Sequence, residues 1–307
     1  MLAFVCSFAG PPVRGAGVSP TDTVAAVRGL LERLLPGKAE GFAFEVISAE
    51  GDRDVFEIES RAGQVVLRGN NGVSLASGLN WYLKYYCQCH HSFTGGSQLR
   101  LPEPLPEVNP KFRRVSTAQH RYFLNYCCFG YSLPWFDWAQ WERLIDWMAL
   151  NGINLPLSVT GQEAVWQAVG RRFDLEARDL EEFLAGPPYL PFGWMGCLDG
   201  HGGPLPQSWT DAHLELGRRI LERQRALGMR PVLQGFTGHV PPAIARKFPA
   251  ARFQKINWCE WETLVLDPLD PLFPRIAAAF LEEQTRLLGT DHYYAADTFI
   301  ENDSAQR

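Results

Sequence analysis

Apolar residues recur at every third or fourth position from residue 137 to residue 150, which is the spacing of an amphipathic helix. Asp137 is a favourable N-cap residue, and Asn151-Gly152 favours a left-handed stop, so we expect the helix to fill this stretch. A mostly apolar run over residues 153–159, Ile-Asn-Leu-Pro-Leu-Ser-Val, follows and predicts a strand. A helix followed by a buried strand is the repeating unit of folds with parallel sheets.

The first part of the chain has a different pattern. Ser19-Pro-Thr-Asp22 is typical of a helix start, and apolar residues at helical spacing follow it. Alternating runs at residues 42–47, 55–58 and 65–67 predict a small antiparallel sheet, and a second helix begins near Gly72. We therefore expect a small α+β domain over residues 19–100. Four prolines then make residues 101–110 a stiff linker.

Residues 111–307 alternate between strand and helix patterns. The expected strands cover residues 120–126, 153–159, 230–236 and 292–299, and the expected helices cover residues 137–150, 177–184, 211–227 and 271–288. A right-handed series of such units predicts a (β/α) barrel, but a complete barrel typically needs about 250 residues. The expected fold class is α/β: a small α+β domain followed by the first half, about four βα units, of a TIM-type (β/α)8 barrel.

Charge and hydropathy limit the expected partners. The net charge is −5 without a basic stripe, so nucleic acid is not expected, and no segment approaches the ~18 uninterrupted apolar residues of a membrane span. Residues 1–18 open on a short apolar run without a basic region, which favours a weak secretion signal or a tail. An open half-barrel would leave the fourth strand with an unpaired edge. We therefore expect poor stability as a monomer and keep a homo-oligomer open as an alternative.

The seven cysteines do not form an evident scaffold. They are scattered in a chain large enough to build an apolar core, so disulfides are not required. Cys87-Gln-Cys89-His90-His91 is the one candidate metal site. Zinc sites usually combine two such pairs, and no second pair has the required spacing, so we expect no metal.

A series of short motifs points to a family. In order, they are Gly96-Ser-Gln-Leu-Arg-Leu-Pro102, Asp137-Trp138, Trp141-Glu142, Ile145-Asp-Trp-Met-Ala-Leu-Asn-Gly-Ile-Asn154, Gly161-Gln-Glu-Ala164 with Trp166, Gly203-Pro-Leu-Pro206, Gly238-His-Val-Pro241, Asp270-Pro271 with Phe273-Pro274, and Ala296-Asp-Thr-Phe299 with Glu301. With these motifs the chain resembles the N-terminal part of glycoside hydrolase family 89, the α-N-acetylglucosaminidases. The domain before residue 96 is similar in layout only.

The resemblance implies a retaining exo-glycosidase that removes terminal α-linked N-acetylglucosamine, as at the non-reducing end of heparan sulfate. Retention requires two carboxyl groups about 5 to 5.5 Å apart. The family's general acid/base matches Glu301, directly after the fourth strand, and the nucleophile is expected more than a hundred residues further on, beyond this chain. No cofactor is implied. The family is lysosomal in animals and exported in bacteria, so the lysosome or secretory pathway, or a bacterial periplasm or exterior, is the expected location.

The resemblance also implies a sugar pocket. The matched substrate-binding positions are Asn125, Cys127, Phe192, Met195, Trp258 and Ile300. From the residues alone, Cys127 is a core cysteine, and Trp258 either stacks on the sugar or packs in the core. Gln162 and Glu163 follow the second strand, where they either brace the pocket or touch substrate.

The chain departs from the family pattern at three places. Ile300 stands where the family usually has Asn, and Phe192 stands where it commonly has Trp. The family's Arg-Met-Gly-Asn loop is Trp194-Met-Gly-Cys197 here, which removes a cation and an amide. The alternative function is therefore a catalytically inactive fragment or a sugar-binding relic of the family.

Overall fold

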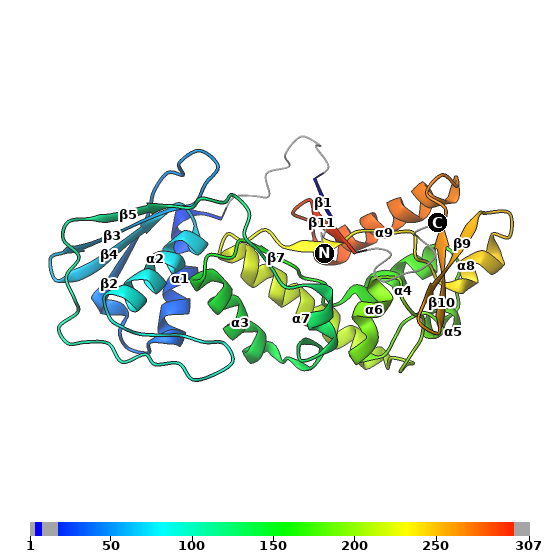
Figure 1. Cartoon of the computed structure of the whole chain (residues 1–307), viewed down its shortest axis with the longest axis horizontal. Coiled ribbons are helices and arrows are strands. Elements are labelled where there is room, and N and C mark those ends of the chain that lie inside the picture. The colour runs from blue at the N-terminus through cyan, green and yellow to red at the C-terminus, as the bar shows by residue number, and fades with distance from the viewer. Residues whose placement is uncertain (1–3, 8–17, 298–307) are drawn as a thin grey trace.

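The computed structural model describes residues 4–7, as backbone, and residues 18–297. The molecule is elongated, with the N-terminal part at one end and the barrel part at the other (Figure 1). No helix in the described part of the chain is both long enough and apolar enough to cross a membrane.

The N-terminal part is a four-stranded sheet with two helices. The helices are α1 (Pro20–Leu34) and α2 (Gly72–Tyr85), capped by the side chains of Ser19 and Asn71. The strands are β2 (Phe42–Val46), β3 (Val55–Arg61), β4 (Gln64–Gly69) and β5 (Phe112–Val115), in the order β2-β4-β3-β5. A single turn, η1 (Ala39–Gly41), precedes β2.

Two expectations for this sheet are corrected. Strand β2 is parallel to β4, so the sheet is mixed rather than antiparallel. Alternation identifies a strand but not its partner, and the β3–β4 hairpin places β4 between β3 and β2. The fourth strand, β5, lies beyond the predicted linker. The linker is bonded to the sheet, because Ser60 and Val108 exchange two hydrogen bonds of 2.9 and 3.0 Å.

The barrel part contains the four predicted parallel strands. They are β6 (Tyr122–Phe123), β7 (Leu155–Pro156), β8 (Val232–Gln234) and β11 (Tyr293–Ala296). Parallel ladders join β6 to β7 and β8 to β11, and a parallel bridge between Leu157 and Val232 joins β7 to β8. Each ladder is shorter than the apolar run that predicted it. Within residues 18–297 the four strands form an open arc of a barrel, which confirms the predicted fold class.

Seven α-helices lie between the first and the last of these strands, within residues 122–296. They are α3 (Trp138–Leu150), α4 (Gln162–Arg172), α5 (Ala177–Glu181), α6 (Leu190–Trp194), α7 (Gln207–Ala226), α8 (Pro242–Lys247) and α9 (Leu272–Leu288). Three single turns, η2 (Tyr126–Gly130), η3 (Leu133–Trp135) and η4 (Pro187–Tyr189), lie in the loops. Asp137 is the N-cap of α3, as predicted, and forms a capping box with Gln140. Helices α4, α6 and α8 were not predicted.

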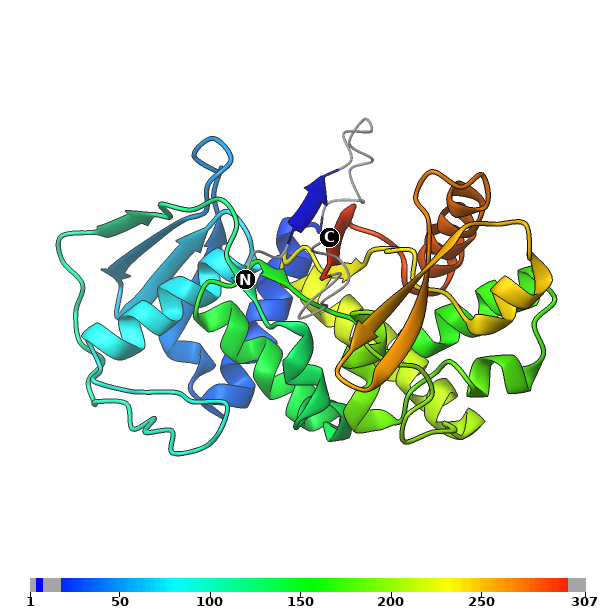
Figure 2. The same cartoon turned by 45° about the vertical axis from the view of Figure 1, so that its right-hand side comes forward.

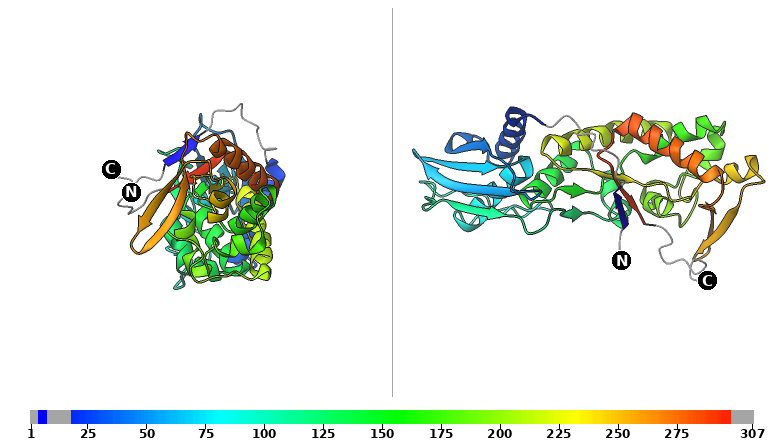
Figure 3. Two further views of the ribbon diagram at one scale, coloured as in Figure 1. Left: turned by 90° about the vertical axis from the view of Figure 1, so that its right-hand side faces the viewer. Right: turned by 90° about the horizontal axis from the view of Figure 1, so that it is seen from above.

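A hairpin outside the parallel arc was also not predicted. Strands β9 (Phe253–Trp258) and β10 (Trp261–Leu266) pair antiparallel and project from one side of the barrel part (Figures 2 and 3). The hydroxyl of Thr263, which is buried, donates to the carbonyl of Gly196 over 2.7 Å. A bridge between His239 and Val265 fixes the hairpin to the loop after β8.

The outer edge of β11 is paired, contrary to the expectation of an unpaired fourth strand. Strand β1 (Phe4–Ser7) lies antiparallel to β11 over four residue pairs. The short apolar opening of the chain therefore supplies backbone partners to this edge.

An ionic cluster around one buried carboxylate joins the two parts of the molecule. Asp146 on α3 is 6% exposed and accepts from Arg33 of α1 over 2.7 and 3.0 Å. It also accepts from Arg223 of α7 over 2.9 Å. Three helices from both parts of the chain therefore meet at one carboxylate.

Candidate active site

The first wall of the candidate site follows β6. Asn125 is the N-cap of η2, and its side-chain oxygen accepts from the Cys128 amide over 3.1 Å. Cys127 lies within η2 and is half-buried. Turn η2 packs on α6, because the ring of Trp194 lies 6.4 Å from that of Tyr126 and 5.8 Å from that of Phe129.

The second wall consists of α6 and the turn of the hairpin. Phe192 stacks on Trp258 with a centroid separation of 5.2 Å and an interplanar angle of 28°. Met195 follows α6 directly and is 2% exposed. The predicted pair Phe192 and Trp258, which is 66 positions apart in sequence, is therefore in contact. Asn125 and Cys127 belong to the turn that packs on the same helix.

Gln162 and Glu163 form the first turn of α4 and lie beneath this wall. They are 0% and 1% exposed. Gln162 donates to the side chain of Gln284 over 2.8 Å, and Gln284 donates to the carbonyl of Gln234 over 3.0 Å. Gln234 in turn donates to the carbonyl of Trp194 over 3.1 Å. A chain of amides thus connects α4, α9, β8 and α6.

Glu163 is a buried acid without a cationic partner among the described residues. Burial raises the pKa of its carboxyl group to about 7. Hydrogen bonds from its own backbone amide and from the Trp194 side chain act in the opposite direction, because they favour the ionised form. Its Oε1 has no hydrogen-bond partner in the described part of the chain. Trp194 is the position at which the family pattern has Arg. The carboxyl group of Glu163 therefore accepts from an indole N–H at this position.

Two further acids lie near the ends of the strands. Asp199 accepts from His239 over 2.7 Å, and His239 is 5% exposed beside the ring of Phe183. Asp297 directly follows β11, and burial raises its pKa. Burial, with the nearby charge of Asp297, also raises the pKa of Tyr122 to about 12. Tyr122 on β6 and Asp297 after β11 therefore lie close enough for their charges to interact.

Glu301 and Ile300 lie outside the described residues, so their predicted roles stay predictions. The roles assigned to the remaining pocket positions also stay predictions, although their placement is now known. Sequence reasoning missed the amides Gln234 and Gln284 and the pair His239–Asp199. Isolated polar residues at wide separations carry no spacing signal, and only the glycines and prolines beside His239 pointed to a special loop.

The candidate metal residues are occupied with other contacts. Cys87 and Cys89 are buried, and burial raises the pKa of the Cys87 thiol to about 11. The Sγ of Cys89 lies 3.4 Å from the carbonyl oxygen of Arg100, and the ring of His91 bonds the hydroxyl of Ser97. Over residues 18–297, no three His, Cys, Asp or Glu side chains gather in a way that could hold a metal ion.

The fold and the site together define a class. This is a (β/α)-barrel chain whose candidate site lies at the carboxyl ends of parallel strands, where barrel enzymes bind their substrates. Its walls combine the stacked rings of Phe192 and Trp258 with the side-chain amide of Asn125, which suits a small polar organic ligand.

Comparisons with known proteins give the family. The family model described as the α-N-acetylglucosaminidase TIM-barrel domain matches residues 121–307, and the model of the N-terminal domain of the same family matches residues 25–107. The chain belongs to the α-N-acetylglucosaminidase family.

Individual relatives agree. Human α-N-acetylglucosaminidase is 44% identical over 298 residues, which is 94% of this chain and 40% of the human protein. A family 89 glycoside hydrolase from Clostridium perfringens, solved with 2-acetamido-1,2-dideoxynojirimycin, superposes with a TM-score of 0.84 at 35% identity, over 88% of this chain and 32% of that one. A substituted form of the Clostridium enzyme, solved with its substrate GlcNAc-α-1,4-galactose, gives the same TM-score and covers 31% of that chain. The chain thus spans less than half the length of these relatives.

Proposed function

We propose that this chain forms the N-acetylglucosamine-binding wall of a retaining exo-glycosidase that releases terminal α-linked N-acetylglucosamine. The observation that carries the proposal is the stacked pair Phe192–Trp258, held against the turn of Asn125 and Cys127 at the carboxyl ends of the strands. Aromatic faces bind the apolar faces of sugar rings, and amide groups bind their polar substituents. Family membership supports the same ligand.

In this proposal Glu301 is the general acid that protonates the leaving oxygen. The same carboxylate then removes a proton from the water that hydrolyses the glycosyl-enzyme intermediate. The nucleophilic carboxylate is the second required group, and by resemblance it lies beyond residue 307. Heparan sulfate is the proposed natural substrate. The lysosome or secretory pathway, or a bacterial periplasm or exterior, is the proposed compartment.

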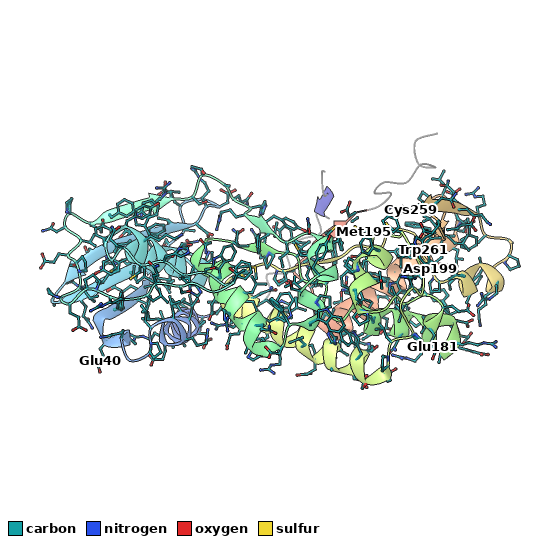
Figure 4. The ribbon with its side chains drawn as sticks, turned by 60° about the horizontal axis from the view of Figure 1, so that its bottom comes forward. Glu40, Glu181, Met195, Asp199, Cys259 and Trp261 are labelled. Carbon is teal, nitrogen blue, oxygen red and sulfur yellow. The ribbon has the colours of Figure 1, made fainter. Side chains whose placement is uncertain are left out.

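The test is release of 4-nitrophenol from 4-nitrophenyl α-N-acetylglucosaminide by the purified 307-residue chain. We expect turnover only when the chain is extended through the region that supplies the nucleophile, and we expect Glu301→Gln to abolish it there. Glu181→Gln is the matched control, because Glu181 is exposed on α5 and lies away from Met195 (Figure 4). Full activity of Glu301→Gln in the extended chain would refute the assignment of the general acid.

The alternative that we propose is a sugar-binding chain without catalysis. Calorimetric titration with 2-acetamido-1,2-dideoxynojirimycin separates the two functions. Binding without turnover by the 307-residue chain supports the sugar-binding function. Absence of binding to both the 307-residue and the extended chain would overturn the proposed site.

A further inference from the structure

A row of aromatic rings continues the wall of the candidate pocket. The ring of Tyr189, at the end of η4, lies 4.4 Å from that of His201, and the ring of His201 lies 4.4 Å from that of Trp261. The three rings come from three separate segments of the chain. Trp261 opens β10, just after the hairpin turn.

The register of the hairpin makes this row continuous with the pocket wall. Trp258 and Trp261 are directly paired across the turn. Residues paired in this way project from the same face of an antiparallel ladder. One face of the hairpin therefore carries Trp258, which stacks on Phe192, and beside it Trp261, which contacts His201.

The geometry of the row leaves ring surface available. Both contacts are edge-to-face, with interplanar angles of 75° and 64°, so in each pair one ring keeps its two faces clear of the other. Tyr189 is 36% exposed, and both His201 and Trp261 are partly exposed. Trp261 and Asp199 are found on the far side of Met195 from the N-terminal part (Figure 4).

We propose that Tyr189, His201 and Trp261 form a subsite for the leaving-group side of the carbohydrate, adjoining the pocket for the terminal sugar. This inference rests on the proposed function. A terminal sugar against Phe192 and Trp258 would have its next residue beside Trp261, because Trp261 is the neighbour of Trp258 on the same hairpin face. Rings with an apolar face and a polar edge group suit a hydrated sugar, whose C–H faces are apolar and whose rim carries hydroxyl groups.

The row determines specificity in this proposal, and it does not take part in bond breaking. It lies outside the predicted pocket for the terminal sugar, so it adds binding energy only for ligands that continue past that sugar. A monosaccharide analogue is therefore insensitive to it, and a disaccharide is sensitive.

The experiment compares two ligands on the full 307-residue chain by calorimetric titration. One ligand is 2-acetamido-1,2-dideoxynojirimycin, which fills the terminal-sugar pocket alone, and the other is GlcNAc-α-1,4-galactose. We expect Trp261→Ala to raise the Kd of the disaccharide by roughly tenfold and to leave the Kd of the analogue unchanged. Tyr85→Ala is the control, because Tyr85 is a 60% exposed aromatic residue in the N-terminal part.

The outcomes separate this inference from the proposed function. If neither the wild-type 307-residue chain nor the extended chain binds either ligand, the proposed function fails and the subsite fails with it. If the wild-type protein binds both ligands and Trp261→Ala affects neither, only the subsite is overturned. If Trp261→Ala loses both ligands, the hairpin has moved, and Tyr189→Ala then decides. Selective loss of the disaccharide in Tyr189→Ala supports the subsite, and unchanged binding overturns it.

Discussion

The buried carboxyl group of Glu163 predicts a pH dependence of stability that one substitution should remove. Glu163 is 1% exposed, and burial raises its pKa from 4.5 to about 7. Because the folded pKa lies above the unfolded one, the folded state holds more protons between these two values. The contribution of this group to the free energy of unfolding is therefore highest below about pH 4.5, and it falls as the pH rises to about 7.

The size of this loss follows from the pKa difference. At about 1.4 kcal/mol per pKa unit, full ionisation of Glu163 costs about 3 kcal/mol. Glu163→Gln removes the titration and keeps the shape of the side chain. The amide oxygen can still accept from Trp194, the side chain that favours the carboxylate in the parent protein. The unfolding free energy of the variant, relative to that of the parent, should thus rise by up to about 3 kcal/mol between pH 5 and pH 7.5.

The assay is urea unfolding of both proteins at half-unit steps of pH. The quantity of interest is the difference in unfolding free energy between variant and parent, in which the titration of all other groups cancels. Glu181→Gln, at an exposed position, should leave this difference flat. A flat difference for Glu163→Gln as well would refute the reasoning, because the buried carboxylate would then be accommodated without cost.

Two further substitutions test how the parts are held together. Asp146→Asn should lower the unfolding free energy by about 3 kcal/mol in urea unfolding, because Arg33 and the partly buried Arg223 lose their shared, buried carboxylate; an unchanged midpoint would show that the cluster contributes nothing. Gly217→Ala should lower it by about 1–3 kcal/mol, because a methyl group on α7 would meet the carbonyl of Thr160. A melting temperature equal to that of the parent would contradict this close approach.

The contrast between α3 and α4 shows which helices a sequence can predict. Helix α3 has a local signal at both ends, with the capping box at Asp137 and the stop at Asn151-Gly152, and the structure ends it at Leu150. Helix α4 begins with Gln162 and Glu163, which are polar and nevertheless buried. Their burial is imposed by distant partners such as Gln284. The spacing of apolar residues cannot identify a helix whose first turn consists of polar residues that are buried by distant partners.

The arc shows the same limit for strands. The run over residues 153–159 is apolar except for Asn154 and Ser158 and predicted seven residues of strand, but the ladder of β7 covers only Leu155–Pro156. Residues after the ladder are still buried, since Leu157 and Val159 are 0% exposed. An apolar run therefore indicates burial. The number of residues in a ladder depends on the length over which the neighbouring strand runs beside it.

The hairpin explains why the candidate site could be predicted only in part. Its turn has Cys259 at a φ of 51°, a conformation that two-residue turns usually give to Gly or Asn, so the sequence lacks the signal for a hairpin. The resemblance could identify Trp258 as a pocket position, because a motif transfers single residues. It could not supply the partner of Trp258 or the row that begins at Trp261, because both depend on a register that this turn determines. Neighbours across a register are thus the part of the site that only the structure can show.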